Sequence, residues 1–155
     1  MTAPPLTAAE QAAMVRALAE ARAAAEAGEV PVGAVVLRDG QLVAVARNRM
    51  RELGDATAHA ELLALQEAAR AVGDARLGEC TLVVTLEPCA MCAGAIVLSR
   101  VGKLLFGAWD PKAGMCGSVG DLVRHTRLNH RPEVRGGVLE AESAALLQGF
   151  FAGRR

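Results

Sequence analysis

The pattern that most constrains this chain is a pair of cysteines two residues apart, Cys89 and Cys92, directly after Pro88. Such a pair suits the start of a helix, where unpaired backbone N–H groups and the helix dipole favour negative charge. That environment lowers the pKa of a thiol toward the thiolate, the form that binds metal ions. With His59 upstream, the chain offers three ligands, and a fourth position left for water is typical of a catalytic zinc site. Glu61 supplies a carboxylate that can move protons near that water.

Two other interpretations of the cysteines remain open at this point. A Cys-x-x-Cys pair in a cytoplasmic protein is also typical of a thioredoxin-like redox pair, which does not need a His-x-Glu motif elsewhere. A structural zinc site with four cysteine ligands would use Cys80 and Cys116 and would leave Glu61 without a role. We therefore favour the catalytic site and expect Cys80 and Cys116 to be buried packing residues.

Length and charge bound the class of protein. A chain of 155 residues, just over half of them apolar, is expected to form one domain over residues 1–155, with residues 1–7 as a flexible N-terminus. The formal net charge of zero excludes a highly charged disordered chain and requires a local basic patch for any nucleic-acid partner. We see no signal peptide and no apolar run near the roughly 18 residues of a membrane span, so we expect a cytoplasmic protein.

Local patterns predict a mixed sheet with helices on both faces. Helices are expected over about 8–27 with a capping box at Thr7 and Glu10, and over 58–72, 89–99 and 140–151. Strands are expected over 32–37 and 41–47, joined by a turn at Asp39-Gly40, and over 81–86 and 103–108. Residues 48–56 and 109–118 are expected to be loops. The strand–helix–strand unit that ends at residue 108 implies two parallel strands.

The predicted elements also restrict the site. His59 and Glu61 fall in the first turn of the helix over 58–72, and residues two apart do not share a helix face. These two side chains can therefore converge on one centre only near the helix end. The cysteine pair follows the strand over 81–86, and the carboxyl end of a strand is the usual ligand position in open α/β sheets.

His-x-Glu followed by Pro-Cys-x-x-Cys resembles the motif pair of zinc-dependent nucleobase deaminases. The resemblance extends to bacterial tRNA-specific adenosine deaminases over about residues 8–155, and it rests on Glu29–Ala34, Asn48, Thr57–Glu61, Thr85–Ala95, Phe106–Ala108, Asp110, Lys112, Gly117–Ser118, Asn129–His130 and Leu146–Phe151. It implies a three-layer α/β/α cytidine deaminase-like fold with a central mixed five-stranded sheet. It also implies a homodimer that converts the wobble adenosine, at the first anticodon position of a tRNA, to inosine with release of ammonia.

Catalytic roles follow from the same resemblance. His59, Cys89 and Cys92 would bind one Zn²⁺ per subunit, with water in the fourth position, and the metal would lower the pKa of that water toward about 7. Glu61 would take the water's proton and deliver it to the base. Asn48 is similar to the family asparagine that hydrogen-bonds the flipped base.

The resemblance also implies contacts to the tRNA. Asp110 is similar to an acid that contacts the sugars of the anticodon loop. Phe150, Phe151 and Arg154 sit where the C-terminal helix of the family lines the RNA groove. The basic stretch from Arg124 to Arg135, with the C-terminal arginines, is expected to contact phosphates, and His125 and His130 within it to be solvated or substrate-facing.

Two alternative functions stay open. The zinc motifs are shared with cytosine, cytidylate and guanine deaminases, so the protein could act on a free base or nucleoside. A non-catalytic, zinc-stabilised RNA-binding module is the second alternative. The segment from Phe106 to Asp110 and the Phe-Phe pair of the C-terminal helix favour the tRNA-acting branch. Two departures from the family pattern, Ala56 for proline and Val83 for tyrosine, affect no expected ligand.

Overall fold

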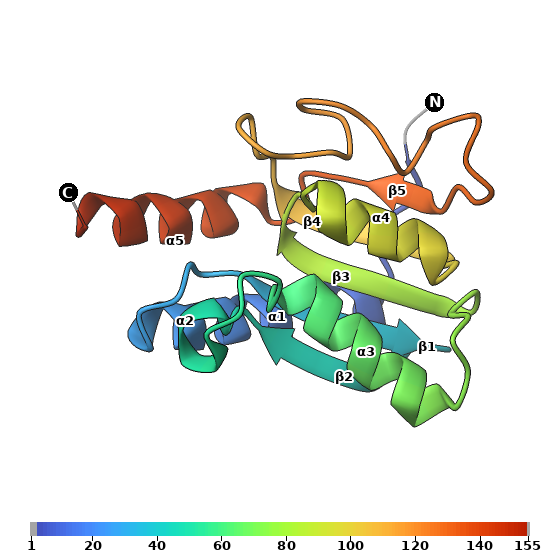
Figure 1. The fold of residues 1–155 in the computed structure, drawn as a ribbon, viewed down its shortest axis with the longest axis horizontal. Helices are drawn as coiled ribbons and strands as arrows, with labels where there is room; N and C mark the ends of the chain where they lie inside the picture. Colours follow the sequence, from blue (N-terminus) through green and yellow to red (C-terminus); the bar gives the residue numbers. More distant parts are fainter. Residues whose placement is uncertain (1–2, 155) are drawn as a thin grey trace.

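A single mixed sheet carries the chain, with a layer of helices on each face (Figure 1). The computed structural model describes residues 3–154. In chain order the elements are α1 (Ala8–Glu26), β1 (Gly33–Arg38), β2 (Gln41–Arg47), α2 (Met50–Leu53), α3 (Ala60–Val72), β3 (Cys80–Leu86), α4 (Ala90–Leu98), β4 (Lys103–Ala108), β5 (Glu133–Arg135) and α5 (Glu140–Ala152). The predicted three-layer α/β/α architecture with a central five-stranded sheet is confirmed.

The sheet has the strand order β2-β1-β3-β4-β5. β1 pairs antiparallel with β2 and with β3, whereas β3 with β4 and β4 with β5 are parallel. The hairpin between β1 and β2 turns at Asp39 and Gly40, whose φ angles of 51° and 74° are the positive values that a two-residue turn requires. Because β3 and β4 are parallel, Leu86 and Ala108 end at the same edge of the sheet.

Helix α1 begins where the capping box predicts. The Thr7 hydroxyl accepts a hydrogen bond from the Glu10 N–H at 3.0 Å, and the Glu10 carboxylate accepts one from the Thr7 N–H at 2.9 Å. The helix packs so closely on β1 that a Cβ at Gly33 would lie 2.0 Å from the Ala17 carbonyl oxygen. Only glycine permits that approach.

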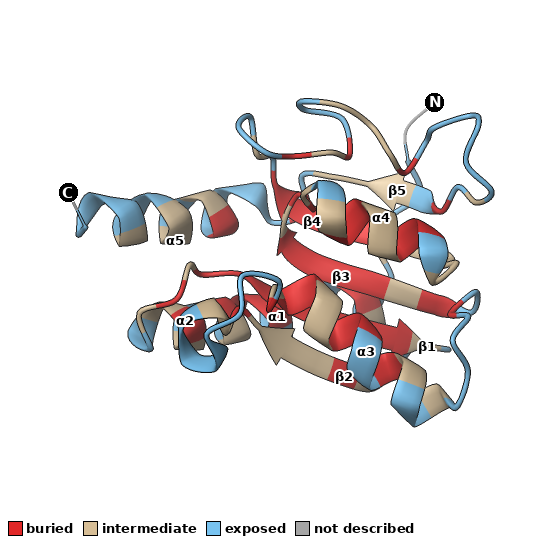
Figure 2. Ribbon diagram, viewed as in Figure 1, coloured by how far each residue is buried: buried red, intermediate tan, exposed pale blue. Residues whose placement is uncertain are grey.

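Each face of the sheet has its own hydrophobic core (Figure 2). One core lies under α3 and α4 and includes Leu65, Ile96 and Phe106. The other lies under α1 and includes Met14 and Val83, so the departure from tyrosine at position 83 lies in the core and away from the expected ligands. Cys80 and Cys116 are buried in the first core, as expected for packing residues. Among residues 3–154, no helix combines the length and the apolar character needed to cross a bilayer.

Two short elements were not predicted. Helix α2 lies inside the segment expected to be a loop, and the N–H groups of its second and third residues, Arg51 and Glu52, donate to the carboxylate of Glu29 at 3.0 and 2.9 Å. This cap comes from more than twenty residues away, so no local pattern indicates it. Strand β5 has three residues, too few to show an alternating pattern.

The basic stretch from Arg124 to Arg135 begins beside the loop of Cys116, to whose carbonyl Arg124 donates at 3.2 Å, and ends away from the cysteine pair. Strand β5 pairs Glu133 with Lys103 at the amino end of β4, the edge opposite to Cys89. His130 Nε2 lies 2.6 Å from the Val101 carbonyl oxygen, and Arg131 donates to three carbonyl groups of its own loop. These contacts brace the loop at that edge, and Arg131 itself stays exposed. The expected phosphate contacts of the stretch stay a prediction.

The N-terminal stretch over residues 1–7, predicted to be flexible, is described from residue 3 onward. The Pro4 carbonyl accepts a hydrogen bond from Arg135 at 2.6 Å, Leu6 packs on the α1 core, and Thr7 caps α1. Met1 and Thr2 lie outside the described residues.

Candidate active site

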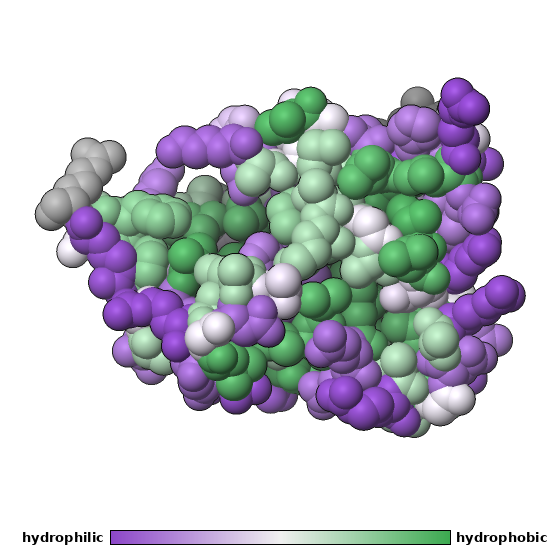
Figure 3. Space-filling model, viewed as in Figure 1, coloured by the Kyte–Doolittle hydropathy of each residue, from purple (hydrophilic) through white to green (hydrophobic). Residues whose placement is uncertain are grey.

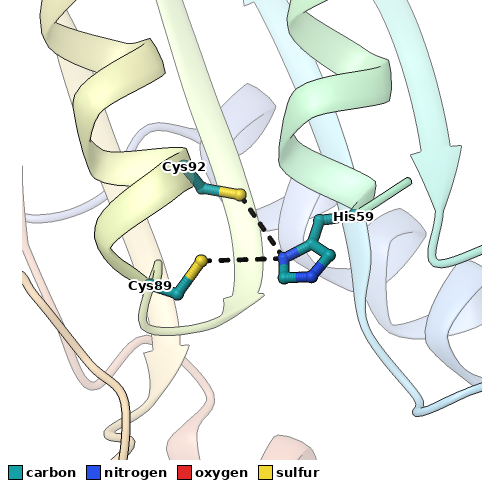
Figure 4. A group of neighbouring side chains, drawn as sticks. All are labelled: His59, Cys89 and Cys92. Atoms are coloured by element: carbon teal, nitrogen blue, oxygen red, sulfur yellow. Dashed lines mark hydrogen bonds between the residues drawn. The ribbon is translucent and has the colours of Figure 1, made fainter. Parts of the chain in front are cut away.

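Two helix starts bring the expected metal ligands together. His59 is the N-cap residue of α3, and Cys89 is the N-cap residue of α4. Both residues have extended backbones, and neither side chain caps its own helix, so both point at a common centre (Figure 4). Cys92 lies in the first turn of α4 and is fully buried.

The three side chains have the spacing of a metal site. His59 Nδ1 lies 3.7 Å from Cys89 Sγ and 3.6 Å from Cys92 Sγ, and the three ligand atoms lie within 4.8 Å of one another. Zn–N and Zn–S bonds of ordinary length at a tetrahedral angle place the two ligand atoms about 3.5 Å apart. The observed distances therefore fit a tetrahedral zinc ion without rearrangement of the helices.

Hydrogen bonds among His59, Cys89 and Cys92 shift the pKa values of all three side chains. Hydrogen bonds from Cys92 and His59 hold the pKa of Cys89 well below its usual value. The hydrogen bond to Cys89 raises the pKa of His59, and donation to Cys89 together with burial raises that of Cys92. A thiolate thus forms at the start of α4, the species that a divalent cation binds.

Glu61 lies in the first turn of α3, and its side chain is 4% exposed. Burial raises its pKa to about 7. It lines a pocket of about 150 Å³ together with His59 and Cys89, so the two side chains of α3 do converge at the helix end, as the sequence required. A carboxyl group with a pKa near 7 both accepts and donates a proton at neutral pH.

Asn48 is buried in the wall of the same pocket. Its Oδ1 accepts a hydrogen bond from the Ala60 N–H at 2.8 Å, and its Nδ2 donates to the Val30 carbonyl at 3.1 Å. These two bonds assign the amide orientation, because Oδ1 must face the Ala60 donor. One N–H of the amide group remains to face the pocket.

A second, larger groove of about 700 Å³ adjoins this pocket, and Val30, Leu86 and Asp110 line both. One wall of the groove is the loop that follows β4, and the other is α5, which extends from the body of the molecule (Figure 1). Asp110 therefore lies at the junction of the two spaces. Its Oδ1 accepts hydrogen bonds from the N–H groups of Lys112 and Ala113.

The structure separates the C-terminal residues that were expected to act together. Phe151 lines the large groove, whereas Phe150 and Arg154 line another groove, between α5 and Ala25 of α1. The Arg154 guanidinium carbon lies 3.9 Å from the centre of the Phe150 ring. Arg155, also expected to contact phosphate, lies outside the described residues.

Sequence reasoning missed Glu87, which organises the loop beside the pocket. Its buried carboxylate accepts hydrogen bonds from the N–H groups of Asp110, Cys116 and Ser118 at 2.9 to 3.0 Å, and from the Ser118 hydroxyl. Burial alone would raise the pKa of Glu87, but these hydrogen bonds hold it below its usual value. A Cβ at Gly114 would lie 2.3 Å from the carboxyl group, so the loop wraps tightly around it.

One signal was available for Glu87. A charged residue directly after a buried strand must find partners, because an isolated buried charge is costly.

The comparisons with known proteins agree with this geometry. Residues 8–155 match the family of MafB19-like deaminases. The chain is 50% identical over 138 residues to a tRNA-specific adenosine deaminase of Bacillus subtilis, covering 89% of this chain and 86% of the relative. It is also 55% identical over 141 residues to a tRNA(Ile)-lysidine synthase of Deinococcus radiodurans, covering 90% of this chain but only 24% of that protein.

Solved structures show the same likeness. A structure from a study of A-to-I editing by tRNA:A34 deaminases at the wobble position superposes with a TM-score of 0.85 at 46% identity, covering 88% of this chain and 99% of the other. A guanine deaminase from Nitrosomonas europaea superposes with a TM-score of 0.82 at 28% identity, covering 97% and 89%.

Proposed function

The chain belongs to the tRNA-specific adenosine deaminases, and we propose that it converts the wobble adenosine of a tRNA anticodon to inosine with release of ammonia. The observation that carries this function is the 50% identity to a deaminase of that name over 86% of the relative's length. The lower identity, 28%, to a guanine deaminase of the same fold supports tRNA over a free base as the substrate.

We propose zinc as the metal held by His59, Cys89 and Cys92, one ion per subunit. Two thiolates and an imidazole favour zinc over magnesium or calcium, which prefer oxygen ligands. When bound, the ion acts as a Lewis acid that lowers the pKa of a water molecule toward about 7.

Glu61 is the proton carrier of the reaction. Its carboxylate accepts the protons that the attacking water loses and delivers them to N1 of adenine and to the departing amino group. The C6–O bond forms, the C6–N bond breaks, and ammonia leaves. Burial suits Glu61 to both steps, because it brings the pKa of the carboxyl group to about 7.

Substrate recognition is assigned to the walls of the two spaces. Asn48 holds the flipped adenine through the part of its amide that the backbone leaves available. Asp110, at the junction with the large groove, contacts the sugars of the anticodon loop, and Phe151 lines that groove on α5. We propose that Phe150 and Arg154, which line a separate groove, contact RNA farther from the target base.

We further propose a homodimer in the cytoplasm, formed as one domain over residues 1–155, with tRNA contacted by both subunits. Apolar side chains gather on the surface over α4 (Figure 3), where Leu98 is 83% exposed. A second copy of the chain would cover them. Equilibrium sedimentation tests this arrangement, and a Leu98→Glu variant should sediment as a monomer.

The decisive experiment offers purified protein an anticodon stem-loop with a wobble adenosine and, separately, free guanine, cytosine and cytidine. Inosine in the stem-loop supports the proposal, whereas ammonia released only from the free compounds overturns it. Glu61→Ala should keep zinc and RNA binding but form no inosine. If the unmodified protein binds the stem-loop and never forms inosine, it is an RNA-binding module.

A further inference from the structure

Trp109 has no role in the proposed chemistry, yet it lies beside it. It follows β4 at the carboxyl edge of the sheet, next to Asp110, and its side chain is 44% exposed. It is the only tryptophan of the chain. Tryptophan is enriched at interfaces, where part of the ring packs on the protein and the rest can meet a partner.

The indole is held in one orientation. It meets the buried Phe106 ring edge to face, with ring centroids 4.8 Å apart and planes at 88°. Two glycines leave room for it, since a Cβ at Gly117 would lie 3.2 Å from the indole and a Cβ at Gly136 would lie 2.8 Å from it. The ring therefore loses little further freedom when a ligand packs against it.

The surroundings of Trp109 suit one unstacked nucleotide. The large groove is walled by Trp109 and Pro111 on one side and by Leu147 and Phe151 of α5 on the other, with Lys112 in its lining. Apolar walls with one cation match a flat base attached to a phosphate. Val30, Leu86 and Asp110 connect the groove to the pocket of Glu61, so a nucleotide in it would be a neighbour of the one being deaminated.

We propose that Trp109 is the stacking platform for the base of a nucleotide adjoining the wobble adenosine, and that it helps to determine which loop sequences are accepted. This inference rests on the proposed function. Drawing the adenosine into a pocket of about 150 Å³ separates it from its neighbours. The adjoining nucleotide then no longer stacks on the adenine, and the indole takes the place of the adenine as its stacking partner. Lys112 lines the same groove and can pair with the phosphate of that nucleotide.

Fluorescence tests the contact directly, because the chain has one tryptophan and no tyrosine. Zinc-loaded Glu61→Ala protein, which does not turn over, is titrated with the stem-loop while the Trp109 emission is followed. Two further stem-loops carry an abasic nucleotide on the 5′ or the 3′ side of the adenosine. We expect quenching by the intact loop and by one abasic loop, and its loss with the other. Equal emission with all three loops at saturation would overturn the proposal.

Steady-state kinetics with intact and abasic loops provide a second test, because a purely structural role of Trp109 would not make KM depend on the presence of one base. In otherwise unmodified protein, Trp109→Ala should raise KM for the intact stem-loop about tenfold, with kcat within about twofold, because base–aromatic stacking has that order of strength. Trp109→Phe should restore most of the loss, and Trp109→Leu should not. With the abasic loop that abolishes quenching, unmodified and Trp109→Ala proteins should have the same KM. An equal rise in KM with both loops would contradict stacking.

The matched control is Leu42→Ala, an exposed apolar residue of β2 outside both spaces, which should leave KM unchanged. If the emission of Trp109 changes on dilution of the protein without RNA, the indole contacts a second copy of the chain, and the proposal is overturned. The two failures are distinguishable. Absence of inosine in the intact loop refutes the proposed function, whereas inosine formation without any response of Trp109 refutes only this inference.

Discussion

Replacing Glu87 by glutamine tests how the pocket keeps its shape. The change keeps the size of the side chain but turns one acceptor oxygen into a donating amide. One carboxylate oxygen accepts from the Asp110 N–H and the Ser118 hydroxyl, and the other accepts from the N–H groups of Cys116 and Ser118. The amide can keep only one side of this arrangement. Fewer bonds are lost if the amide oxygen faces the N–H groups of Cys116 and Ser118. The amide nitrogen, itself a donor, then faces the Asp110 N–H, which loses its acceptor.

The magnitude follows from the kind of bond that is lost. Hydrogen bonds to a charged group contribute about 1.5–3 kcal/mol each, and an unpaired buried N–H adds about 1–3 kcal/mol. We therefore expect Glu87→Gln to lower the free energy of unfolding by about 3 kcal/mol. Asp110 borders both the pocket and the large groove, so its displacement should also raise KM for the stem-loop. Zinc content should not change, because Cys89 is held by the start of α4.

Urea denaturation, metal analysis and steady-state kinetics measure these three quantities. The control is Glu67→Gln, an exposed residue of α3. If Glu87→Gln matches Glu67→Gln in both stability and KM, Glu87 does not organise the loop and the reasoning is refuted. If it loses zinc instead, Glu87 supports the metal ligands rather than Asp110.

Three further outcomes are expected. Removing the metal with a chelator should abolish deamination while far-UV circular dichroism keeps its folded shape, because the sheet carries two cores of its own; complete unfolding would contradict this. Gly33→Ala should lower the free energy of unfolding by about 3 kcal/mol or prevent folding, since its Cβ would overlap the Ala17 carbonyl, and thermal melting measures the loss. Burial alone would raise the pKa of Glu10, but the hydrogen bond and charge of Lys103, with the capping bonds from Thr7, lower it. Because the pKa is lowered on folding, the ionised carboxylate stabilises the folded state at pH values above its unfolded pKa of about 4.3, and this stabilisation is lost as the pH falls through the folded pKa. Glu10→Gln should therefore be less stable than the unmodified protein at pH 7. Urea denaturation should show this difference shrinking toward pH 3.

Local sequence information was sufficient wherever structure depends on neighbours in the chain. The capping box of Thr7, the turn at Asp39 and Gly40 and the ends of β2 and β4 agree with expectation because each depends on a few adjacent residues. The convergence of His59, Cys89 and Cys92 was also predictable, because these residues lie at two helix starts.

Features that depend on distant partners were not predictable. Helix α2 needs the carboxylate of Glu29, and the role of Glu87 depends on a loop more than twenty residues later. The separation of Phe150 from Phe151 follows from the direction in which α5 leaves the sheet, which no periodicity reveals. The position of the end of the basic stretch was not predictable for the same reason, because only the pairing of β5 with β4 sets the edge on which Glu133 to Arg135 lie.

The convergence of two helix starts on the metal ligands has an electrostatic consequence. With a divalent cation bound, two thiolates at Cys89 and Cys92 would balance its charge, so the cluster with a neutral imidazole at His59 would carry no net charge. The amino ends of α3 and α4 each add the equivalent of about half a positive charge directed at this point. In the proposed reaction, negative charge that builds up on the purine would be met by two fixed dipoles that need not reorient, which would lower the barrier in addition to any effect of the ion.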